Sequence, residues 1–473
     1  MPTTRIVYGA SAYQIGAELR TFVTRHGITW TFSKQEYVGY YANGDPYVYA
    51  PNGVTIVAIS PQSAENSGIS GWIQHGSMIN PSEGDVQGYD SRSANTFDIS
   101  NNVAMPGADV LDAGNPLVVP AGSSLVSTRS KGTPDNWPQL LDASVLTVVD
   151  TYPAPGSFRP PYSGTDKTAT WTTNDIDWAW LESRQVARAS LDPADLPDIE
   201  SLYSQVERVW LDHNVFWTFT RLQPENNMPS YGREISKVTG DVALAISLDY
   251  SREELFNLVV AYTQLGIDLY GVAVSGGVWN ADGGIYCGRK IPVVFAGQIL
   301  GSAAIQAYGN AATHFIFQED QQTYEVTQTL IDTSQSGLIS EGGCWHPDTR
   351  GGTVAYEQAD LGLPEWGIRF SQWRGDTCST GVWAPDASWD AFYRLVVSGP
   401  YAGTALAGQI LGLTPNWNWD YFFDYIDRYV EAGENSVHSN WPGQAGQTNG
   451  PTNLSAAMWQ AFRDSYPPVW SGS

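Results

Sequence analysis

Residues 251–262 read SREELFNLVVAY and contain both the start and the buried face of a helix. Ser251 is followed three residues later by Glu254, the capping-box pattern that satisfies free backbone N–H groups at a helix N-terminus. Apolar residues then recur at i, i+3, i+4 and i+7 from Leu255 to Tyr262, which places them on one face. The stretch predicts an amphipathic helix packed against a core.

The same helical period continues through the C-terminal part of the chain. It recurs over residues 235–248, 291–308, 391–411 and 417–430. Long loops rich in Gly, Asn and Trp separate these stretches, and loops of that length in a compact domain are commonly functional. Helix pairs joined by long loops predict an (α/α) toroid, in which inner helices surround a cleft. An α-solenoid with a flat binding face is the alternative.

The N-terminal third has the pattern of strands. Residues 53–59, 117–119 and 145–149 are runs rich in β-branched side chains, separated by clusters of Asn, Gly, Pro and Ser. Asn43-Gly44 lies between two aromatic-rich runs and predicts a hairpin turn. These features favour an antiparallel, sandwich-like sheet.

The two patterns divide the chain into two expected domains. Residues 1–165 would form the β-rich domain, and their end includes the Pro-rich connector 152–161, which fixed φ angles make stiff. Residues 166–473 would form the toroid and carry the active site. The fold class expected from the sequence is therefore mainly α, an (α/α) toroid with an N-terminal β-rich domain.

Composition restricts the possible partners. The chain of 473 residues has 24 Lys and Arg against 49 Asp and Glu, a formal net charge of −25. That charge repels nucleic acid and anionic membranes, so neither is an expected partner. The 19 Trp and 25 Tyr supply flat amphipathic rings on which sugars stack, although packing between helices would use them equally well. We expect an extracellular or periplasmic protein, although its first residues lack the apolar run of a signal peptide.

Polar residues crowd before the helix predicted at 235–248. Residues 225–234 read ENNMPSYGRE. Asn226, Asn227 and Arg233 bring amide donors and a guanidinium to a helix N-terminus, where the dipole is positive, and this combination can bind a carboxylate. The alternative is a plain helix cap whose arginine pairs with a neighbouring carboxylate.

A glycine-rich loop precedes the next helix. Residues 275–290 read SGGVWNADGGIYCGRK and place Trp279, Tyr286 and the pair Arg289-Lys290 among glycines. Because glycine lets a ligand approach the backbone closely, these four side chains are candidates for substrate binding. Glycines that only permit tight turns are the alternative. The GxxxxGK[ST] spacing of a phosphate loop is missing.

A second loop, residues 341–357, collects groups able to bind sugar or transfer protons. It contains Glu341, Trp345, His346 and Tyr356. A lone His is more often structural than catalytic. Six His and three Cys without HExxH or CxxC spacing make a metal site unexpected. The absence of GxSxG argues against a hydrolase with a nucleophile elbow.

Five stretches resemble proteins of polysaccharide lyase family 38. They are residues 156–167 (GSFRPPYSGTDK), 226–233 (NNMPSYGR), 266–271 (GIDLYG), 288–292 (GRKIP) and 364–369 (PEWGIR). The resemblance extends from about residue 27 to residue 430. It implies an (α/α)-toroid lyase whose substrate is an acidic polysaccharide of β-1,4-linked uronic acids, such as glucuronan or mannuronate-rich alginate. One position departs from the family pattern, because relatives carry a His where this chain has Ile285.

β-Elimination on a uronate requires three groups and no cofactor. One neutralises the C6 carboxylate, a base removes the C5 proton, and an acid protonates the leaving O4. The candidates are Asn226, Asn227 and Arg233 as neutralisers, Tyr231 and Tyr356 as proton carriers, and His213 or His346 as the alternative base. A tyrosine base would need a pKa lowered by neighbouring cations.

Two other classes of function stay open on the sequence. An inverting glycoside hydrolase on the same toroid would use paired carboxylates such as Asp282, Glu341 or Glu357. A non-catalytic glycan-binding or virion-associated protein would account for Ile285 in place of a His. Oligosaccharide binding without turnover would distinguish this second alternative from an enzyme.

Overall fold

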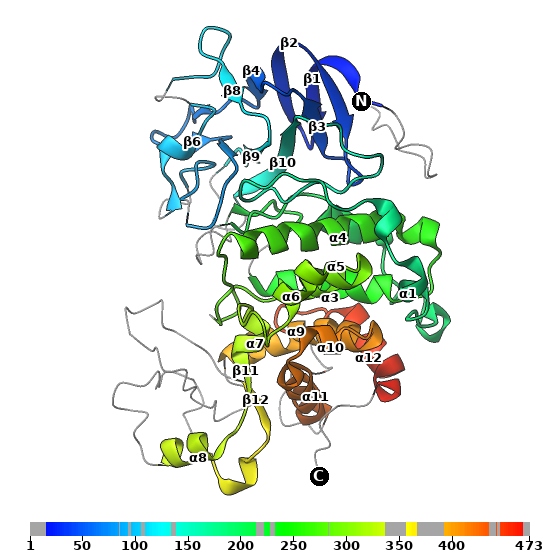
Figure 1. The fold of residues 1–473 in the computed structure, drawn as a ribbon. Coiled ribbons are helices and arrows are strands. Elements are labelled where there is room, and N and C mark those ends of the chain that lie inside the picture. The colour runs from blue at the N-terminus through cyan, green and yellow to red at the C-terminus, as the bar shows by residue number, and fades with distance from the viewer. Residues whose placement is uncertain are drawn as a thin grey trace.

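A computed structural model gives the fold of the chain. It describes residues 16–84, 86–92, 96–105, 109–133, 139–213, 222–227, 232–281, 283–335, 356–366, 392–434, 441 and 445–466. Of the described residues, 38% are helical and 20% lie in strands, and a large, nearly closed mixed sheet fills the N-terminal part. The expectation of a mainly α toroid is therefore wrong. Figure 1 shows the sheet at one end of the molecule and the helices stacked in layers beneath it.

The sheet has eight strands. They are β1 (Glu18–Arg25), β2 (Ile28–Tyr40), β3 (Pro46–Tyr49), β4 (Val54–Ser60), β7 (Ser77–Ile79), β8 (Leu117–Val119), β9 (Ser123–Ser130) and β10 (Leu140–Val149). Their order is β7-β9-β10-β3-β2-β4-β8, with β1 paired to β2. Neighbouring strands are antiparallel except β10 and β3, which run parallel. The expected antiparallel sandwich is thus corrected to a single mixed sheet.

Local sequence signals account for these strands. The three β-branched runs form β4, β8 and β10 as predicted. The Asn43-Gly44 turn joins β2 to β3, and Gly44 has the φ of +82° that favours glycine at such a turn. Within β2, Ile28, Trp30 and Phe32 alternate with less buried residues and point into the core of the sheet.

Twelve α-helices lie in the described part of the chain. They are α1 (Trp178–Glu182), α2 (Ile199–Val206), α3 (Gly232–Ile246), α4 (Arg252–Val274), α5 (Lys290–Ile299), α6 (Ala303–Gly309), α7 (Gln318–Gln322), α8 (Gln328–Gln335), α9 (Phe392–Ile410), α10 (Thr414–Trp417), α11 (Asp420–Glu434) and α12 (Asn453–Phe462). Two short antiparallel pairs, β5 (Ala64–Glu65) with β6 (Ile73–Gln74) and β11 (Thr323–Glu325) with β12 (Pro364–Trp366), complete the described strands.

The helix predicted from residues 251–262 is the start of α4. Its capping box is confirmed, since the Ser251 side chain accepts from the backbone of Glu254 and the Glu254 carboxylate accepts from the backbone of Ser251. The helix predicted at 291–308 is divided into α5 and α6, and Gly301 between them has a positive φ of +59°. The continuous helical period of residues 291–308 therefore did not reveal the break between α5 and α6.

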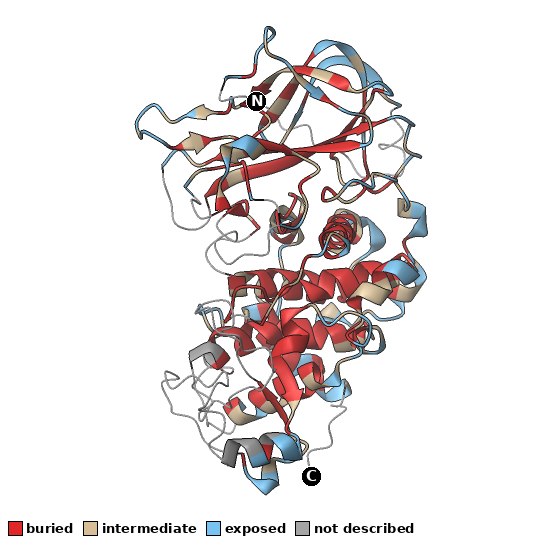
Figure 2. Cartoon of the chain, turned by 60° about the vertical axis from the view of Figure 1, so that its left-hand side comes forward, coloured by how far each residue is buried: buried red, intermediate tan, exposed pale blue. Residues whose placement is uncertain are grey.

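The helices form stacked layers, which is why no toroid results. α4 lies between the sheet and the pair α3 and α5, and α9, α11 and α12 lie beyond that pair (Figure 1). α3 packs mainly on α9, and α4 packs mainly on α5. Figure 2 shows the central helices buried along most of their length. α4 is the one described helix long and apolar enough to span a membrane, and 83% of its most apolar window is buried in this fold.

Arg159, in the connector after β10, joins the sheet to the helices. Its Nε donates to Asp45 in the β2–β3 turn at 2.7 Å, and its Nη2 donates to Asp268 of α4 at 2.5 Å. All three side chains are almost fully buried. A charged group from each layer is thus neutralised at the boundary between them.

Candidate functional site

Asp212 and Arg289 form a buried ion pair next to the glycine-rich loop. The Arg289 Nε donates to Asp212 Oδ2 at 2.8 Å, and its Nη2 donates to Oδ1 at 3.2 Å. The same carboxylate accepts from Gln223 at 2.8 Å and from the Trp279 indole at 3.3 Å. The Arg289 side chain is 0% exposed. Arg289 and Trp279, two of the predicted substrate-binding residues, are therefore engaged inside the protein.

Lys290 is also held in a buried ion pair. Its Nζ donates to both oxygens of Asp320 at 2.5 and 2.6 Å and lies 4.7 Å from the centre of the Trp417 ring. Burial lowers the pKa of Lys290, and Asp320 opposes that shift. The predicted dibasic pair thus holds the start of α5 in place and presents no free cation to a substrate.

Helix α7 fixes the loop that leads into α5. Gln318 and Gln322 both donate to the carbonyl of Gly283, and the backbone N–H of Tyr286 donates to Gln318. Glu319 accepts from the backbone N–H of Gly288 at 2.7 Å. Burial raises the pKa of Glu319 to about 7. Polar side chains of α7 thus satisfy backbone groups of Gly283, Tyr286 and Gly288 in this loop.

Sequence reasoning missed α7 entirely. Residues 318–322 read QEDQQ, five polar residues in succession, which is the composition of a solvated turn. All five are buried. A signal was present, because the glycine-rich loop needs hydrogen-bond partners for its backbone and such a run supplies them. No local sequence pattern shows that residues 318–322 contact the glycine-rich loop, however.

The loop packs directly against the start of α3. A Cβ on Gly232 would collide with the carbonyl of Ile285, and one on Gly288 would lie 2.6 Å from Cα of Ser236. Gly288 also has a φ of +85°, which favours glycine. These glycines allow backbone-to-backbone contact, so the two predicted motifs, residues 225–234 and 275–290, lie together in space.

His213 is enclosed. Its Nδ1 lies 3.4 Å from the Tyr162 hydroxyl, which itself accepts from the backbone N–H of Asp212 at 2.9 Å. The rings of Tyr89 and Tyr162 lie edge-on to the imidazole at 5.9 and 5.8 Å. Burial lowers the pKa of His213 to about 3. The imidazole is neutral near pH 7 and 0% exposed, so it does not reach a substrate.

The predicted carboxylate neutralisers separate into buried and accessible groups. Asn227 is 0% exposed and donates to the carbonyls of Arg208 and Val209 at 3.3 and 3.2 Å. Arg233 lies 3.1 Å from the Glu234 carboxylate, and its side chain is 14% exposed. This ion pair is the helix-cap alternative anticipated for the motif. Asn226 is half-buried.

Tyr356 belongs to a different cluster, beside the antiparallel pair β11 and β12. Its hydroxyl lies 2.5 Å from that of Tyr324, and nearby Arg394 donates to Glu365 at 2.6 Å. Burial, Tyr324 and Glu365 raise the pKa of Tyr356 well above its usual value, and Arg394 offsets this only in part. The shift is opposite to the one that a tyrosine base requires.

Two of the remaining candidates, Tyr286 and Trp279, have enclosed rings. Tyr286 is buried, and Trp279 stacks on Phe317 at 5.1 Å, so neither ring is a platform for sugar. Glu357 is exposed at the start of a short 3₁₀ helix. The candidates that lie outside the described residues are Tyr231, Asp282, Glu341, Trp345 and His346. Among the described residues, no three His, Cys, Asp or Glu side chains group as a metal site.

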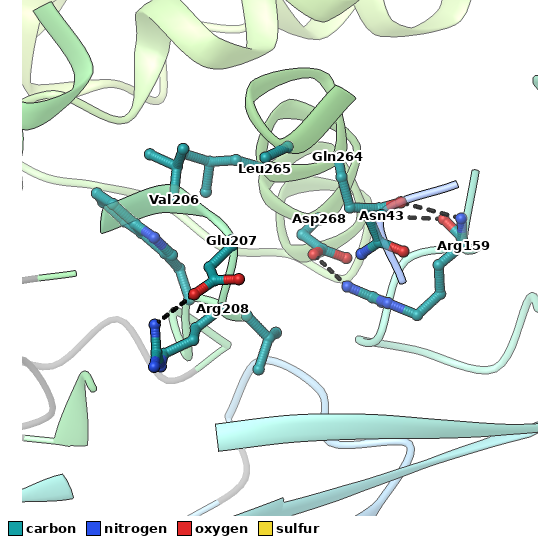
Figure 3. A pocket seen from close by; sticks show the side chains of 11 residues that line it. Asn43, Arg159, Val206, Glu207, Arg208, Gln264, Leu265 and Asp268 are labelled. Carbon is teal, nitrogen blue, oxygen red and sulfur yellow. Dashed lines mark hydrogen bonds and ion pairs between the residues drawn. The ribbon is translucent and has the colours of Figure 1, made fainter. Parts of the chain in front are cut away.

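A small cavity lies at the boundary between sheet and helices, and two of its lining residues, Arg208 and Val209, accept hydrogen bonds from Asn227. Its space of about 240 Å³ includes part of the open solvent, and its polar lining comes from Asn43, Arg159, Glu207, Arg208, Gln264 and Asp268. Figure 3 shows Arg159 bonded to Asp268, and Arg208 bonded to Glu207. Because these groups satisfy one another, we assign the cavity no ligand.

Comparisons with known proteins find no relative of this chain. No family model matches the chain, and no curated protein or solved structure matches it at a significant level. The resemblance to polysaccharide lyases therefore depends on the five sequence stretches alone.

Proposed function

We propose that the protein is a lyase that cleaves chains of β-1,4-linked uronic acids by β-elimination. The observation that carries the proposal is a continuous series of contacts between four of the five stretches that resemble the lyases. Asp268, in residues 266–271, binds Arg159, in residues 156–167. Residues so distant in sequence would not need to meet if each stretch served only its own helix or turn.

The series continues to the other two stretches. Tyr162, in the same stretch as Arg159, accepts from the backbone of Asp212, and Asp212 binds Arg289 of residues 288–292. The loop before Arg289 packs against Gly232 of residues 226–233. The series ends at the N-terminus of α3, where the helix dipole favours a negative ligand.

The proposal assigns the roles of carboxylate neutralisation and proton transfer. Asn226 and Arg233 would neutralise the substrate carboxylate, because Asn227, Arg289 and Lys290 are fully buried. Arg233 would exchange its contacts with Glu234 and the carbonyl of Thr448 for the substrate. Tyr231, next to Gly232 in the sequence, would carry the proton. The C5 proton passes to the base, its electron pair forms the C4=C5 double bond, the C4–O4 bond breaks, and O4 takes a proton.

The product distinguishes the possible activities. Incubation with polymannuronate and with glucuronan should produce the ultraviolet absorbance of an unsaturated uronate. New reducing ends without that absorbance would indicate a hydrolase. Binding of oligosaccharide without any product would indicate a glycan-binding protein, the second candidate, which the enclosure of His213 and Tyr356 favours.

Replacement of one hydroxyl tests the assigned proton carrier. We expect Tyr231→Phe to lower kcat by at least about 100-fold, the usual contribution of a general acid or base. Tyr356→Phe is the matched control and should retain most of the activity, because its hydroxyl contacts Tyr324 inside the protein. Full activity of Tyr231→Phe, with an unchanged circular dichroism spectrum, would remove Tyr231 from the mechanism.

A further inference from the structure

Three tyrosines form a half-exposed cluster on the outer face of the sheet. Tyr152, which follows β10, stacks on Tyr49 of β3 with ring centres 4.0 Å apart and planes 17° from parallel. Tyr37 of β2 meets Tyr152 edge-on at 6.5 Å. Tyr37 is 44% exposed and Tyr152 is 46% exposed. Large aromatic rings are therefore held in a fixed arrangement at the surface.

Strand register produces the arrangement. Tyr37 lies directly opposite Tyr49 on β3 and directly opposite Leu19 on β1. Side chains paired in this way share one face of a sheet, and adjacent strands are about 4.8 Å apart. The next residues, Val38 and Val48, point to the opposite face and are buried in the core. The sheet thus places a row of apolar side chains outward at a spacing close to the length of one sugar ring.

The tyrosine hydroxyls are available to a ligand. The hydroxyls of Tyr37, Tyr49 and Tyr152 form no hydrogen bond with any described residue. Each ring therefore presents an apolar face beside a free donor and acceptor. A pyranose has the complementary surface, because its C–H groups form an apolar face and its hydroxyls lie around the edge.

The nearby charges favour an uncharged ligand. Arg20 of β1 is bonded to Glu18 at 2.6 Å, and Lys34 of β2 lies 3.7 Å from Glu36. The described cations of these two strands around the cluster are thus already paired, and Asp150, two residues before Tyr152, is exposed. Among the described residues of β1 and β2, no unpaired cation is left to balance a uronate, and a polyanion would also meet the net charge of −25.

We propose that Tyr37, Tyr49 and Tyr152 form a binding surface for a neutral polysaccharide. The surface is separate from the proposed uronate site, because β1, β2 and β3 lie on the far side of α4 from α3 and α5 (Figure 1). It would hold the protein on a neutral glycan whatever reaction occurs elsewhere. The proposal does not depend on the proposed lyase activity.

Binding measured without turnover tests the surface. Affinity electrophoresis of the full chain through neutral β-glucan, mannan and xylan should show retardation in at least one of them, and no greater retardation in alginate. We expect Tyr37→Ala and Tyr152→Ala each to weaken binding roughly tenfold, whereas Tyr152→Phe, which keeps the ring, should weaken it much less. Tyr40→Ala is the matched control, since Tyr40 is also 44% exposed but makes no ring contact with a described residue.

Three results would overturn the proposal. The first is no retardation in any neutral glycan, and the second is equal loss of binding in Tyr40→Ala. The third is a concentration-dependent dimer in sedimentation velocity that Tyr152→Ala dissociates, because a second copy of the chain would then cover the tyrosines. A failed lyase assay would leave all of these measurements unaffected, so the two proposals fail separately.

Discussion

The buried charge of Arg289 depends on one partner. Arg289 is 0% exposed and has Asp212 as its only described carboxylate within ion-pair distance. Removing one member of a buried pair typically costs about 3–5 kcal/mol, because the other charge is left uncompensated. We expect Arg289→Met to lower the free energy of unfolding by that amount in urea titrations.

The matched control for Arg289→Met uses an exposed pair. Arg252 binds Glu182 at the surface, with side chains 55% and 44% exposed. Solvent screens such an exposed pair, so Arg252→Met should change stability little. Equal losses in the two variants would show that burial does not determine the strength of these pairs.

Glu319 should make stability depend on pH. Burial raises its pKa from 4.5 to about 7, so the folded state binds the proton more tightly than the unfolded state. The sign follows from that difference: this contribution to stability is fully present below pH 4.5 and is lost as pH rises through 7. Glu319→Gln cannot ionise and should lack this dependence.

Urea titrations at several pH values measure the effect. The stability of the wild type relative to Glu319→Gln should fall by on the order of 2–3 kcal/mol between pH 4.5 and pH 7.5. The exposed Glu357→Gln variant should follow the wild type throughout. A constant difference between wild type and Glu319→Gln across this range would refute the assignment.

Residue types were easier to predict than residue roles. The sequence identified Arg289 and Lys290 as basic residues among glycines, and a ligand was the partner that local spacing suggested. Their partners are Asp212, 77 positions away from Arg289, and Asp320, 30 positions away from Lys290. Desolvation requires a buried charge to be paired, but no local pattern reveals which carboxylate does so.

Elements pack closely where glycine permits it. Gly266 of α4 faces α5, and a Cβ there would collide with the carbonyl of Pro292 and lie 2.5 Å from Cβ of Ala296. The two helices would have to separate, so we expect Gly266→Ala to cost about 1–3 kcal/mol in thermal unfolding. Gly132→Ala, which meets no described atom within 4 Å, is the control and should leave the melting temperature unchanged.

The helices and strands that were predicted correctly are those whose sequence pattern is local. The cap and apolar stripe of α4 depend on neighbours within eight residues, and both were predicted correctly. The three β-branched runs likewise formed strands. The polar helix α7 was missed because its stability comes from backbone groups of a distant loop.

At the scale of the whole molecule, Arg159 couples the sheet to the helices. Its two ion pairs, with Asp45 and Asp268, are almost fully buried at that boundary, where Asp142 of β10 also binds Arg208. We expect the wild type to unfold in one calorimetric transition and Arg159→Met to show two. Intrinsic fluorescence and far-ultraviolet circular dichroism should then give different midpoints. Coincident midpoints in the variant would indicate that apolar contacts alone couple the layers.

The fold class was predicted wrongly because the sequence pattern does not show how the helices are arranged in the whole molecule. A helical period shows which face of a helix is buried but not which helix covers it, so a ring and a stack of layers produce the same pattern. The sheet has a similar ambiguity, because β10 pairs with both β9 and the distant β3. Long-range pairing of this kind has no local signature.

The position of α12 affects how the chain folds during synthesis. Thr452 and Ser455 of its N-terminal turn hydrogen-bond to Asp241 of α3, more than 200 positions earlier. A ribosome completes every strand of the eight-stranded sheet by Val149, yet α3 leaves the exit tunnel long before α9 and α12 exist. The apolar side of α3 in nascent chains should therefore stay exposed to solvent for many seconds, at about 5–20 residues per second, and chaperones should bind it there.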